Sequence, residues 1–444
     1  MISRFFQRNS FHARKFAHFA VRPGIAGPHC PHLRRCDHVD NFTPYDSIHN
    51  RCARLGDKFL PLAIFLHFKI RGASQKLQQV LPKIMTGPAN SDCVISERGG
   101  MVENTHRVHA AVVDAEGTLL YSVGDPSRIT LIRSAAKPAQ ALAILETGCF
   151  EKYGFDDADL ALVCASHSSE ERHIQRAQAM LKKIGATEED LCCGGHHALS
   201  DAVNRAWIKK DLEPSAICNN CSGKHAGMIA GALTIGADKA GYELPDHPMQ
   251  VRVKQVVDDL CLSQNTSWAL DGCHLPAPAV PLRNAALLYA RLANAAAHSD
   301  RKEQVPDRET QLRRVFHAMS SHPEMVGGEG RFCTLLAEAF QGQLVGKLGA
   351  DGCYGVAIRP SEEDSNARAM GIAVKIEDGN IDVLYEAVTE ILEQLQIGSD
   401  DTRRKLSRFH QGKRLNTAGA VAGRVYSTFR LRQIADSQSI STTR

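Results

Sequence analysis

The sequence predicts an α+β fold in which helices pack against an antiparallel sheet. Two β-hairpins indicate the antiparallel arrangement: one over residues 109–123 with a turn at Glu116-Gly117, and one over residues 371–385 with a turn at Asp378-Gly379. Helical segments are mixed among the hairpins, and strands do not alternate regularly with helices as in a doubly wound parallel sheet.

The elements between the hairpins follow from local signals. An Ala- and Leu-rich helix over residues 139–147 stops at a glycine, and the apolar run over residues 159–164 predicts a buried strand. Ser168 and Glu171 form a predicted capping box, which opens a helix ending at Gly185. The remaining expected elements are helices over residues 226–235, 284–297 and 386–395 and strands over residues 345–348 and 354–358.

Charge is unevenly distributed along the 444 residues. Residues 1–88 hold 14 Lys and Arg against four Asp, a net charge of +10, which leaves −6 for the remainder of a chain whose total is +4. This basic, acid-poor segment resembles a mitochondrial presequence; a disordered extension and an upstream segment wrongly joined to the reading frame are the alternatives. We therefore expect a basic N-terminal extension over residues 1–90, a catalytic domain over residues 91–435 and a flexible tail over residues 436–444.

Composition narrows the class of protein. With 43% hydrophobic and 23% charged residues the chain is typical of globular proteins, and its mildly acidic body gives no reason to expect nucleic-acid binding. No apolar stretch reaches the roughly 18 residues that a membrane span needs. Fourteen cysteines in no regular framework indicate reduced thiols of an intracellular protein. We expect a cytoplasmic location, with a mitochondrial one as the alternative.

Two serines and two lysines are candidates for nucleophilic chemistry. Ser134 precedes Lys137 by three residues at the predicted start of a helix, where a neutral amine can activate a hydroxyl; a serine cap beside a solvated lysine is the alternative. Ser166 follows the predicted buried strand, a position suited to an exposed hydroxyl. Lys347 leads a strand before a glycine, as in the Lys-Thr-Gly strand of enzymes that also use Ser-x-x-Lys, and its alternative is a surface lysine.

Two further groups of residues suggest ligand binding. Cys221, Lys224 and Cys273 are able to converge on one zinc ion, because zinc binds thiolate sulfur readily and its ligands are often far apart in sequence. Buried structural cysteines are the alternative. Residues 327–331, with the sequence GGEGR, predict a loop that is mobile or faces an anion.

Taken together, these segments resemble the Rhizobium etli-type L-asparaginase family, also called the asparaginase II or thermolabile asparaginase family. The resemblance runs in order from about residue 91 to about residue 435. Its motifs are ERGGMVENTHRVHAAVVD from Glu97, RSAAKPAQALAILETG from Arg133, CASHSSEERH from Cys164, CGGHHALSD from Cys193, NNCSGKHAGM from Asn219, DGCHLPAPAVPL from Asp271, HPEMVGGEGRFCT from His322 and GKLGADG from Gly346.

The resemblance implies a serine β-lactamase-like and glutaminase-like fold, a homodimer, a zinc cofactor and hydrolysis of L-asparagine to L-aspartate and ammonia. It also assigns roles to residues of this chain. These are two Ser-Lys pairs (Ser134 with Lys137, Ser166 with Lys347), three zinc ligands (Cys221, Lys224, Cys273) and four substrate-binding positions (Arg133, His225, Asp271, Cys333).

A mechanism follows as a hypothesis. Ser134 attacks the side-chain amide carbon with neutral Lys137 as the general base, and water then hydrolyses the acyl-enzyme. Ser166 with Lys347 relays protons or stabilises the oxyanion. Which serine takes the acyl group stays open at this point. The alternatives are a Ser-Lys amidase or glutaminase that acts on another small amide, and a non-catalytic homologue stabilised by zinc.

Overall fold

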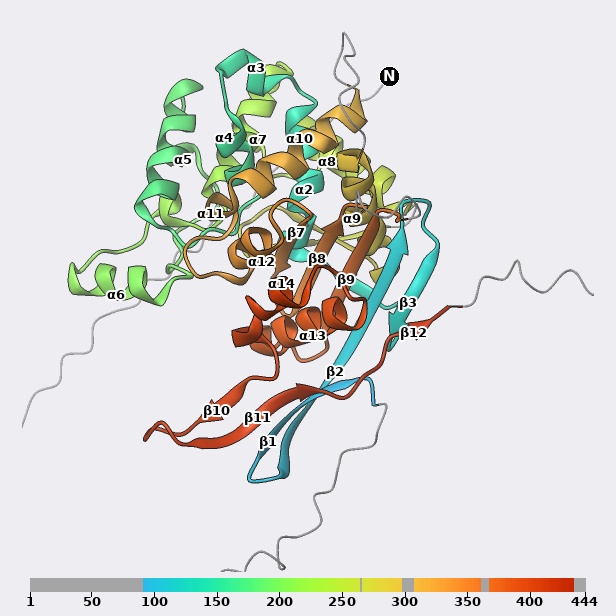
Figure 1. Cartoon of the computed structure of the whole chain (residues 1–444). Helices are drawn as coiled ribbons and strands as arrows, with labels where there is room; N and C mark the ends of the chain where they lie inside the picture. The colour runs from blue at the N-terminus through green and yellow to red at the C-terminus, as the bar shows by residue number, and fades with distance from the viewer. Residues whose placement is uncertain (1–90, 264–265, 298–306, 361–366, 435–444) are drawn as a thin grey trace, which may run out of the picture. The chain divides into compact units, whose positions relative to one another are not determined.

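The computed structural model describes residues 91–434 except for 264–265, 298–306 and 361–366 (Figure 1). The predictions for residues 1–90 and 436–444 fall outside these described residues. In the described part, most helices gather at one end of an antiparallel sheet, and two long hairpins extend from the other end (Figure 1). The predicted fold class is confirmed.

The main sheet is antiparallel throughout and has the order β10-β11-β1-β2-β9-β8-β7, with β3 and β12 joined beside β2. Strand β2 (Met101–Asp114) organises it, because its first part pairs with β1 and its second part with β3 and β9. A smaller sheet has the order β4-β6-β5. The other strands are β1 (Cys93–Arg98), β3 (Leu119–Val123), β4 (Ile129–Leu131), β5 (Ser267–Leu270), β6 (Pro276–Pro281), β7 (Leu344–Gly349), β8 (Cys353–Ile358), β9 (Met370–Ile376), β10 (Lys413–Leu415), β11 (Val421–Ser427) and β12 (Arg432–Gln433).

Helix α9 (Leu282–Ala297) packs unusually closely against β2, β8 and β9. The strands offer glycines at the contact: a Cβ atom on Gly355 would lie 1.9 Å from the Tyr289 ring, and one on Gly371 would lie 1.9 Å from the Ala286 carbonyl oxygen. Tyr289 uses this position to donate a hydrogen bond of 2.6 Å to the carbonyl oxygen of Ala135. The sheet core is thereby connected to the segment that carries Ser134.

Helix α7 (Ser222–Thr234) is buried along most of its length and contacts α2, α4 and α5. Its composition of small residues permits these contacts on all sides. The other α-helices are α2 (Lys137–Leu145), α3 (Cys149–Tyr153), α4 (Asp157–Val163), α5 (Glu171–Lys183), α6 (Asp201–Lys209), α8 (Pro248–Cys261), α10 (Arg308–Ser321), α11 (Pro323–Val326), α12 (Phe332–Phe340), α13 (Ile381–Gln394) and α14 (Asp400–Arg404). The 3₁₀ turns are η1 (Arg133–Ala136), η2 (Glu188–Asp190), η3 (Ala216–Cys218) and η4 (Ser407–Phe409).

Most predicted elements are confirmed, but the strand predicted over residues 159–164 is wrong. This segment belongs to helix α4, which Asp156 caps by accepting a hydrogen bond of 2.8 Å from the amide of Asp159. The Asp159 carboxylate in turn accepts a hydrogen bond of 3.0 Å from the amide of Asp156. Helix α4 is buried on nearly every side, and a helix of that kind has the continuous apolar sequence of a buried strand.

Two helix starts were also placed wrongly. Residues 380–385, predicted as the second strand of a hairpin, begin helix α13, because the Asn380 side chain accepts a hydrogen bond of 3.0 Å from the amide of Val383. The capping box predicted at Ser168 lies two residues further on. Glu170 is the cap residue and its amide donates to His173 Nδ1 at 3.1 Å, since Ser169 adopts a left-handed φ of 58° and delays the helix.

None of the helices among the described residues combines the length and the apolar character that crossing a membrane requires.

Candidate active site

A cavity of about 460 Å³ opens where η1, the segment after α4, the start of α7 and the end of β7 meet. Six of the predicted site residues line it: Arg133, Ser134, Ser166, Cys221, Asp271 and Cys273. A larger hollow of about 1190 Å³, beside Arg359 and Arg368, contains none of them. The candidate chemistry is therefore confined to the smaller cavity.

Ser134 reaches the cavity wall through a constrained backbone. It lies in the 3₁₀ turn η1, directly before helix α2, and follows Arg133, whose left-handed φ of 51° is rare for a residue with a side chain. Strand β7 approaches this turn closely because Gly349 has no side chain; a Cβ atom there would lie 2.3 Å from the carbonyl oxygen of Ile132. The half-buried serine is thus held at one position on the wall.

Both predicted catalytic lysines contact the hydroxyl of Ser166. Lys347 Nζ lies 2.8 Å from Ser166 Oγ, and Lys137 Nζ lies 3.3 Å from the same atom. Lys137 also donates to the carbonyl oxygen of Ala165, and the amide of Ser166 donates to Val326 at 3.1 Å. Ser134 is not among the hydrogen-bond partners of Lys137 in the described part of the chain. The structure therefore brings both predicted lysines to Ser166, and it shows no hydrogen bond between Ser134 and Lys137, the other predicted pair, among the described residues.

Lys347 is the lysine whose proton is easily lost. Its side chain is fully buried, and burial together with the neighbouring charge of Lys137 lowers its pKa to about 7. Besides Ser166, its amine donates to the carbonyl oxygen of Leu348 at 2.8 Å. A buried amine with this pKa is suited to accept and return a proton at neutral pH.

The three predicted metal ligands also lie together. Lys224 Nζ is 3.2 Å from Cys273 Sγ, and the Cys221 and Cys273 thiols share a hydrogen bond. That hydrogen bond, with the ammonium of Lys224, lowers the pKa of Cys273 to about 5, while the same bond and burial raise the pKa of Cys221 to about 12. Cys221 Sγ also donates a hydrogen bond of 3.0 Å to Asn220 Oδ1.

This donor set fits zinc. Zinc prefers thiolate sulfur and nitrogen in a tetrahedral arrangement, in which a sulfur and a nitrogen ligand lie about 3.5 Å apart. The distance of 3.2 Å between Lys224 Nζ and Cys273 Sγ is close to that value, and Cys221 supplies a second sulfur beside it. Lys224 must lose its proton to act as a ligand, so metal binding would release protons.

Comparison with known proteins identifies the family. The family model described as L-asparaginase II matches residues 94–427. The chain belongs to the L-asparaginase II family. Its members are amidohydrolases, so the protein is an enzyme with a small-molecule substrate. The resemblance to this family that the sequence indicated is confirmed.

Solved structures similar to this L-asparaginase II family chain are glutaminases. A Bacillus subtilis glutaminase in covalent complex with 5-oxo-L-norleucine is 15% identical, with 66% of this chain and 88% of that chain covered and a TM-score of 0.31. A probable glutaminase from Bacillus subtilis complexed with 6-diazo-5-oxo-L-norleucine is 15% identical, with coverage of 78% and 99% and a TM-score of 0.32. Among proteins with curated descriptions, none matches this sequence.

Arg133 and Asp271, two predicted substrate-binding residues, form an ion pair at the cavity. Arg133 Nε donates to Asp271 Oδ1 at 2.7 Å, and the other side of the guanidinium pairs with Asp351. Although burial opposes the charged form, the cations Lys224 and Arg133 lower the pKa of Asp271 overall. Both carboxylates therefore share one guanidinium.

His225 and Cys333, the other two predicted substrate-binding residues, lie behind the wall. His225 is fully buried and its Nδ1 is 2.6 Å from the hydroxyl of Tyr242. Burial and the adjacent Lys224 lower its pKa to about 3, so the ring is neutral. Cys333 Sγ accepts a hydrogen bond of 3.2 Å from the hydroxyl of Tyr354. In the described part of the chain, neither residue lines the cavity.

Among the cavity residues that were not predicted, Arg331, Asp351 and Tyr385 carry side chains that bear on the chemistry. The signal for Arg331 was present, because the loop over residues 327–331 was expected to be mobile or to face an anion. Asp351 follows the motif lysine strand and adopts a left-handed φ of 57°. Tyr385 lies in the first turns of α13, the part of this helix that was wrongly predicted as a strand, and so it could not be placed.

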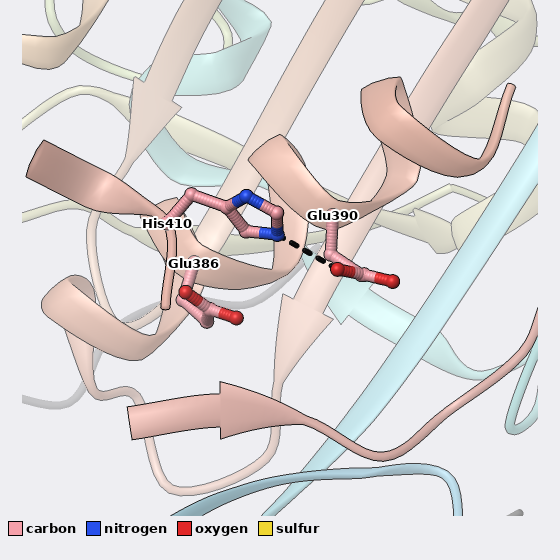
Figure 2. A group of neighbouring side chains, drawn as sticks. All are labelled: Glu386, Glu390 and His410. Carbon is pink, nitrogen blue, oxygen red and sulfur yellow. Dashed lines mark hydrogen bonds and ion pairs between the residues drawn. The ribbon is translucent and has the colours of Figure 1, made fainter. Parts of the chain in front are cut away.

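A second group of metal-ligand side chains lies away from the cavity, on α13 and the segment after η4. Figure 2 shows Glu386, Glu390 and His410 with their donor atoms close together. His410 Nε2 is 2.7 Å from Glu390 Oε2, while Glu386 accepts a hydrogen bond of 3.1 Å from the amide of Ser427. Burial favours the neutral ring, but the bond to Glu390 and the neighbouring Glu386 raise the pKa of His410 overall. These hydrogen bonds hold the segment after η4 and the end of β11 against α13.

Proposed function

We propose that this member of the L-asparaginase II family hydrolyses L-asparagine to L-aspartate and ammonia by Ser-Lys catalysis. The observation that supports this best is the pair of buried lysines on the Ser166 hydroxyl, at the wall of a cavity that Ser134 also lines. Such a group holds protons where an amide carbonyl can enter, and amide hydrolysis requires one proton for the leaving nitrogen.

We assign the nucleophile to Ser134. The oxygen of Ser166 accepts hydrogen bonds from both lysines whenever they are protonated, which leaves its lone pairs engaged. Ser134 lies on the same cavity with its oxygen free of the lysines. Ser134 Oγ would form the new bond to the amide carbon, and its proton would pass to the group formed by Ser166, Lys137 and Lys347.

The same group would then complete the reaction. The C–N bond of the tetrahedral intermediate breaks when the proton moves to the amide nitrogen, and ammonia leaves. Water attacks the acyl-enzyme and gives a proton to the Ser166 group, and this proton passes to Ser134 Oγ as the acyl C–O bond breaks and L-aspartate is released. Lys347, with its pKa of about 7, is suited to hold the proton between these steps.

Zinc, held by Cys221, Lys224 and Cys273, would supply a positive charge beside the cavity. In the chain itself, Lys137 Nζ lies 3.2 Å from Cys221 Sγ, so the metal ligands also position the lysine that contacts Ser166. Metal analysis of the purified protein tests the cofactor, and full activity in metal-free protein would argue against an essential role.

We also propose that the protein forms a homodimer, and light scattering of the purified protein tests this.

Ammonia release from L-asparagine and L-glutamine is the decisive assay. We expect asparagine to be the better substrate, in accordance with the family description, L-asparaginase II. S134A should abolish turnover, whereas S320A on the exposed end of α10 should not change it. Absence of ammonia release from both substrates by the zinc-loaded protein would refute the proposal.

A covalent label identifies the nucleophile independently of turnover. The diazoketone analogue of asparagine alkylates an activated serine in place of being hydrolysed. Peptide mass spectrometry should find the adduct on Ser134 in the native protein and in the S320A control. An adduct on Ser166 would transfer the nucleophile role to that residue and leave the reaction class unchanged.

A further inference from the structure

The cavity wall carries two opposite charges at separate places. Arg133 is paired with both Asp271 and Asp351, so these three side chains carry a net charge of −1, and Asp271 also lies near the ammonium of Lys224. Arg331 lines the same cavity, and its guanidinium makes no ion pair with any carboxylate among the described residues. Its partners are neutral: NH1 donates to Ser168 Oγ at 3.2 Å, and the Tyr385 hydroxyl lies beside it.

The loop over residues 327–331 fixes the position of Arg331. Gly328 has a φ of 117°, and a Cβ atom there would lie 2.5 Å from Glu170 Oε1 and 2.7 Å from the Ser168 side chain. The next amide, that of Glu329, donates to Glu170 Oε1 at 2.7 Å. Arg331 then begins α12 as its cap residue. The guanidinium is therefore presented to the cavity by a docked loop, and little ordering is needed when a ligand binds.

The other cations at the cavity are already engaged. Lys137 and Lys347 donate to Ser166 and to the carbonyl oxygens of Ala165 and Leu348, at the place where the amide reacts. Arg133 is neutralised by its two carboxylates. Arg331 is thus the cation of the described cavity wall that is available to a substrate carboxylate, and a guanidinium binds a carboxylate through two parallel hydrogen bonds.

We propose that Arg331 binds the α-carboxylate of the substrate and that the Asp271–Arg133–Asp351 group binds its α-ammonium. This inference rests on the proposed function and assigns the residues that recognise the two charged α-groups of its substrate. An amide that lacks the α-carboxylate or the α-amine leaves one of these charged groups without a partner inside the cavity, and is rejected for that reason.

The experiment compares two substrates that differ only in the α-carboxylate: L-asparagine and 3-aminopropanamide. R331Q should lower kcat/KM for asparagine roughly 10- to 100-fold more than kcat/KM for 3-aminopropanamide, the effect of losing a charged hydrogen bond, because any shift in the Lys347 midpoint affects both substrates alike. R331K should recover part of the loss. The matched control is R408Q, because Arg408 holds the same loop through the carbonyl oxygen of Gly330 but is exposed and does not line the cavity.

An equal loss on both substrates would show that Arg331 only supports the loop and would overturn the proposal, as would an unchanged kcat/KM for asparagine in R331Q. Calorimetric titration with L-aspartate and with β-alanine, which lacks the α-carboxylate, measures binding affinity in the absence of turnover. We expect native protein to prefer aspartate and R331Q to lose that preference. Native protein that binds both alike refutes the assignment, whereas preserved binding without ammonia release refutes only the proposed function.

Discussion

The rate of amide hydrolysis should depend on pH in the way that the buried lysine Lys347 dictates. This amine must be neutral to accept a proton, and its pKa of about 7 makes the neutral fraction roughly a tenth at pH 6, a half at pH 7 and nine tenths at pH 8. We therefore expect kcat/KM to rise about tenfold from pH 6 to pH 8 and to stay level from pH 8 to pH 9. A lysine with the ordinary pKa of about 10.4 would instead give a further tenfold rise over that last unit.

Steady-state ammonia release between pH 5.5 and pH 9.5 measures this profile, and two variants test its cause. Burial and the cations Lys137 and Arg331 lower the pKa of Lys347, while Cys333 and Cys221 raise it. R331Q should consequently move the midpoint to higher pH, and C333S should move it to lower pH. A profile that still rises tenfold between pH 8 and pH 9, or one that both variants leave in place, would refute the reasoning.

Three further predictions concern stability. K347M should raise the free energy of unfolding by roughly 2–4 kcal/mol at pH 7 and below, because the lowered pKa means that folding disfavours the protonated lysine there. The gain should shrink to nothing as the pH rises from 7 to about 10.4, and urea unfolding at several pH values measures it; a gain that grows with pH contradicts it. G349A should destabilise by roughly 1–3 kcal/mol and reduce turnover, since its Cβ would meet Ile132, whereas G412A, with open space around it, should do neither. D156A should lower stability by about 1 kcal/mol through loss of the α4 cap, and S200A, whose capping distance is 3.4 Å, by less; equal thermal shifts would contradict this.

Much of the fold was predictable because hairpins and amphipathic helices leave periodic sequence signals. The hairpin of β2 and β3 and helix α9 are examples. Helix α4 was not predictable in this way, since its burial removes the polar face that distinguishes a helix from a strand. Asp156 was the signal that could have identified this segment as a helix. An Asp directly before the first turn is a typical helix cap, and its carboxylate accepts a hydrogen bond from the amide three residues later, that of Asp159.

The site was predictable only as a set of residues. Spacing along the chain suggested that Ser134 pairs with Lys137, but the structure directs Lys137 toward Ser166 and Cys221. The direction of a lysine side chain depends on where the partners lie in three dimensions, and no short motif contains that information. Arg331 and Asp351 were missed for a related reason: their charges become informative only when their ion-pair partners, or the absence of such partners among the described residues, are known.

Several features at this wall of the cavity lower the stability of the folded protein. Arg133 and Asp351 adopt left-handed backbone conformations that cost about 1 kcal/mol or more each, and Lys347 is buried without an acidic partner among the described residues. A cavity wall selected for stability alone would replace that lysine with an apolar side chain. These costs fall on Lys347, which contacts Ser166, on Arg133, which precedes Ser134, and on Asp351, which pairs with Arg133, and they support the proposed location of the chemistry independently of the family. If K347M both stabilises the protein and abolishes turnover, one variant would show that Lys347 lowers stability and is needed for activity.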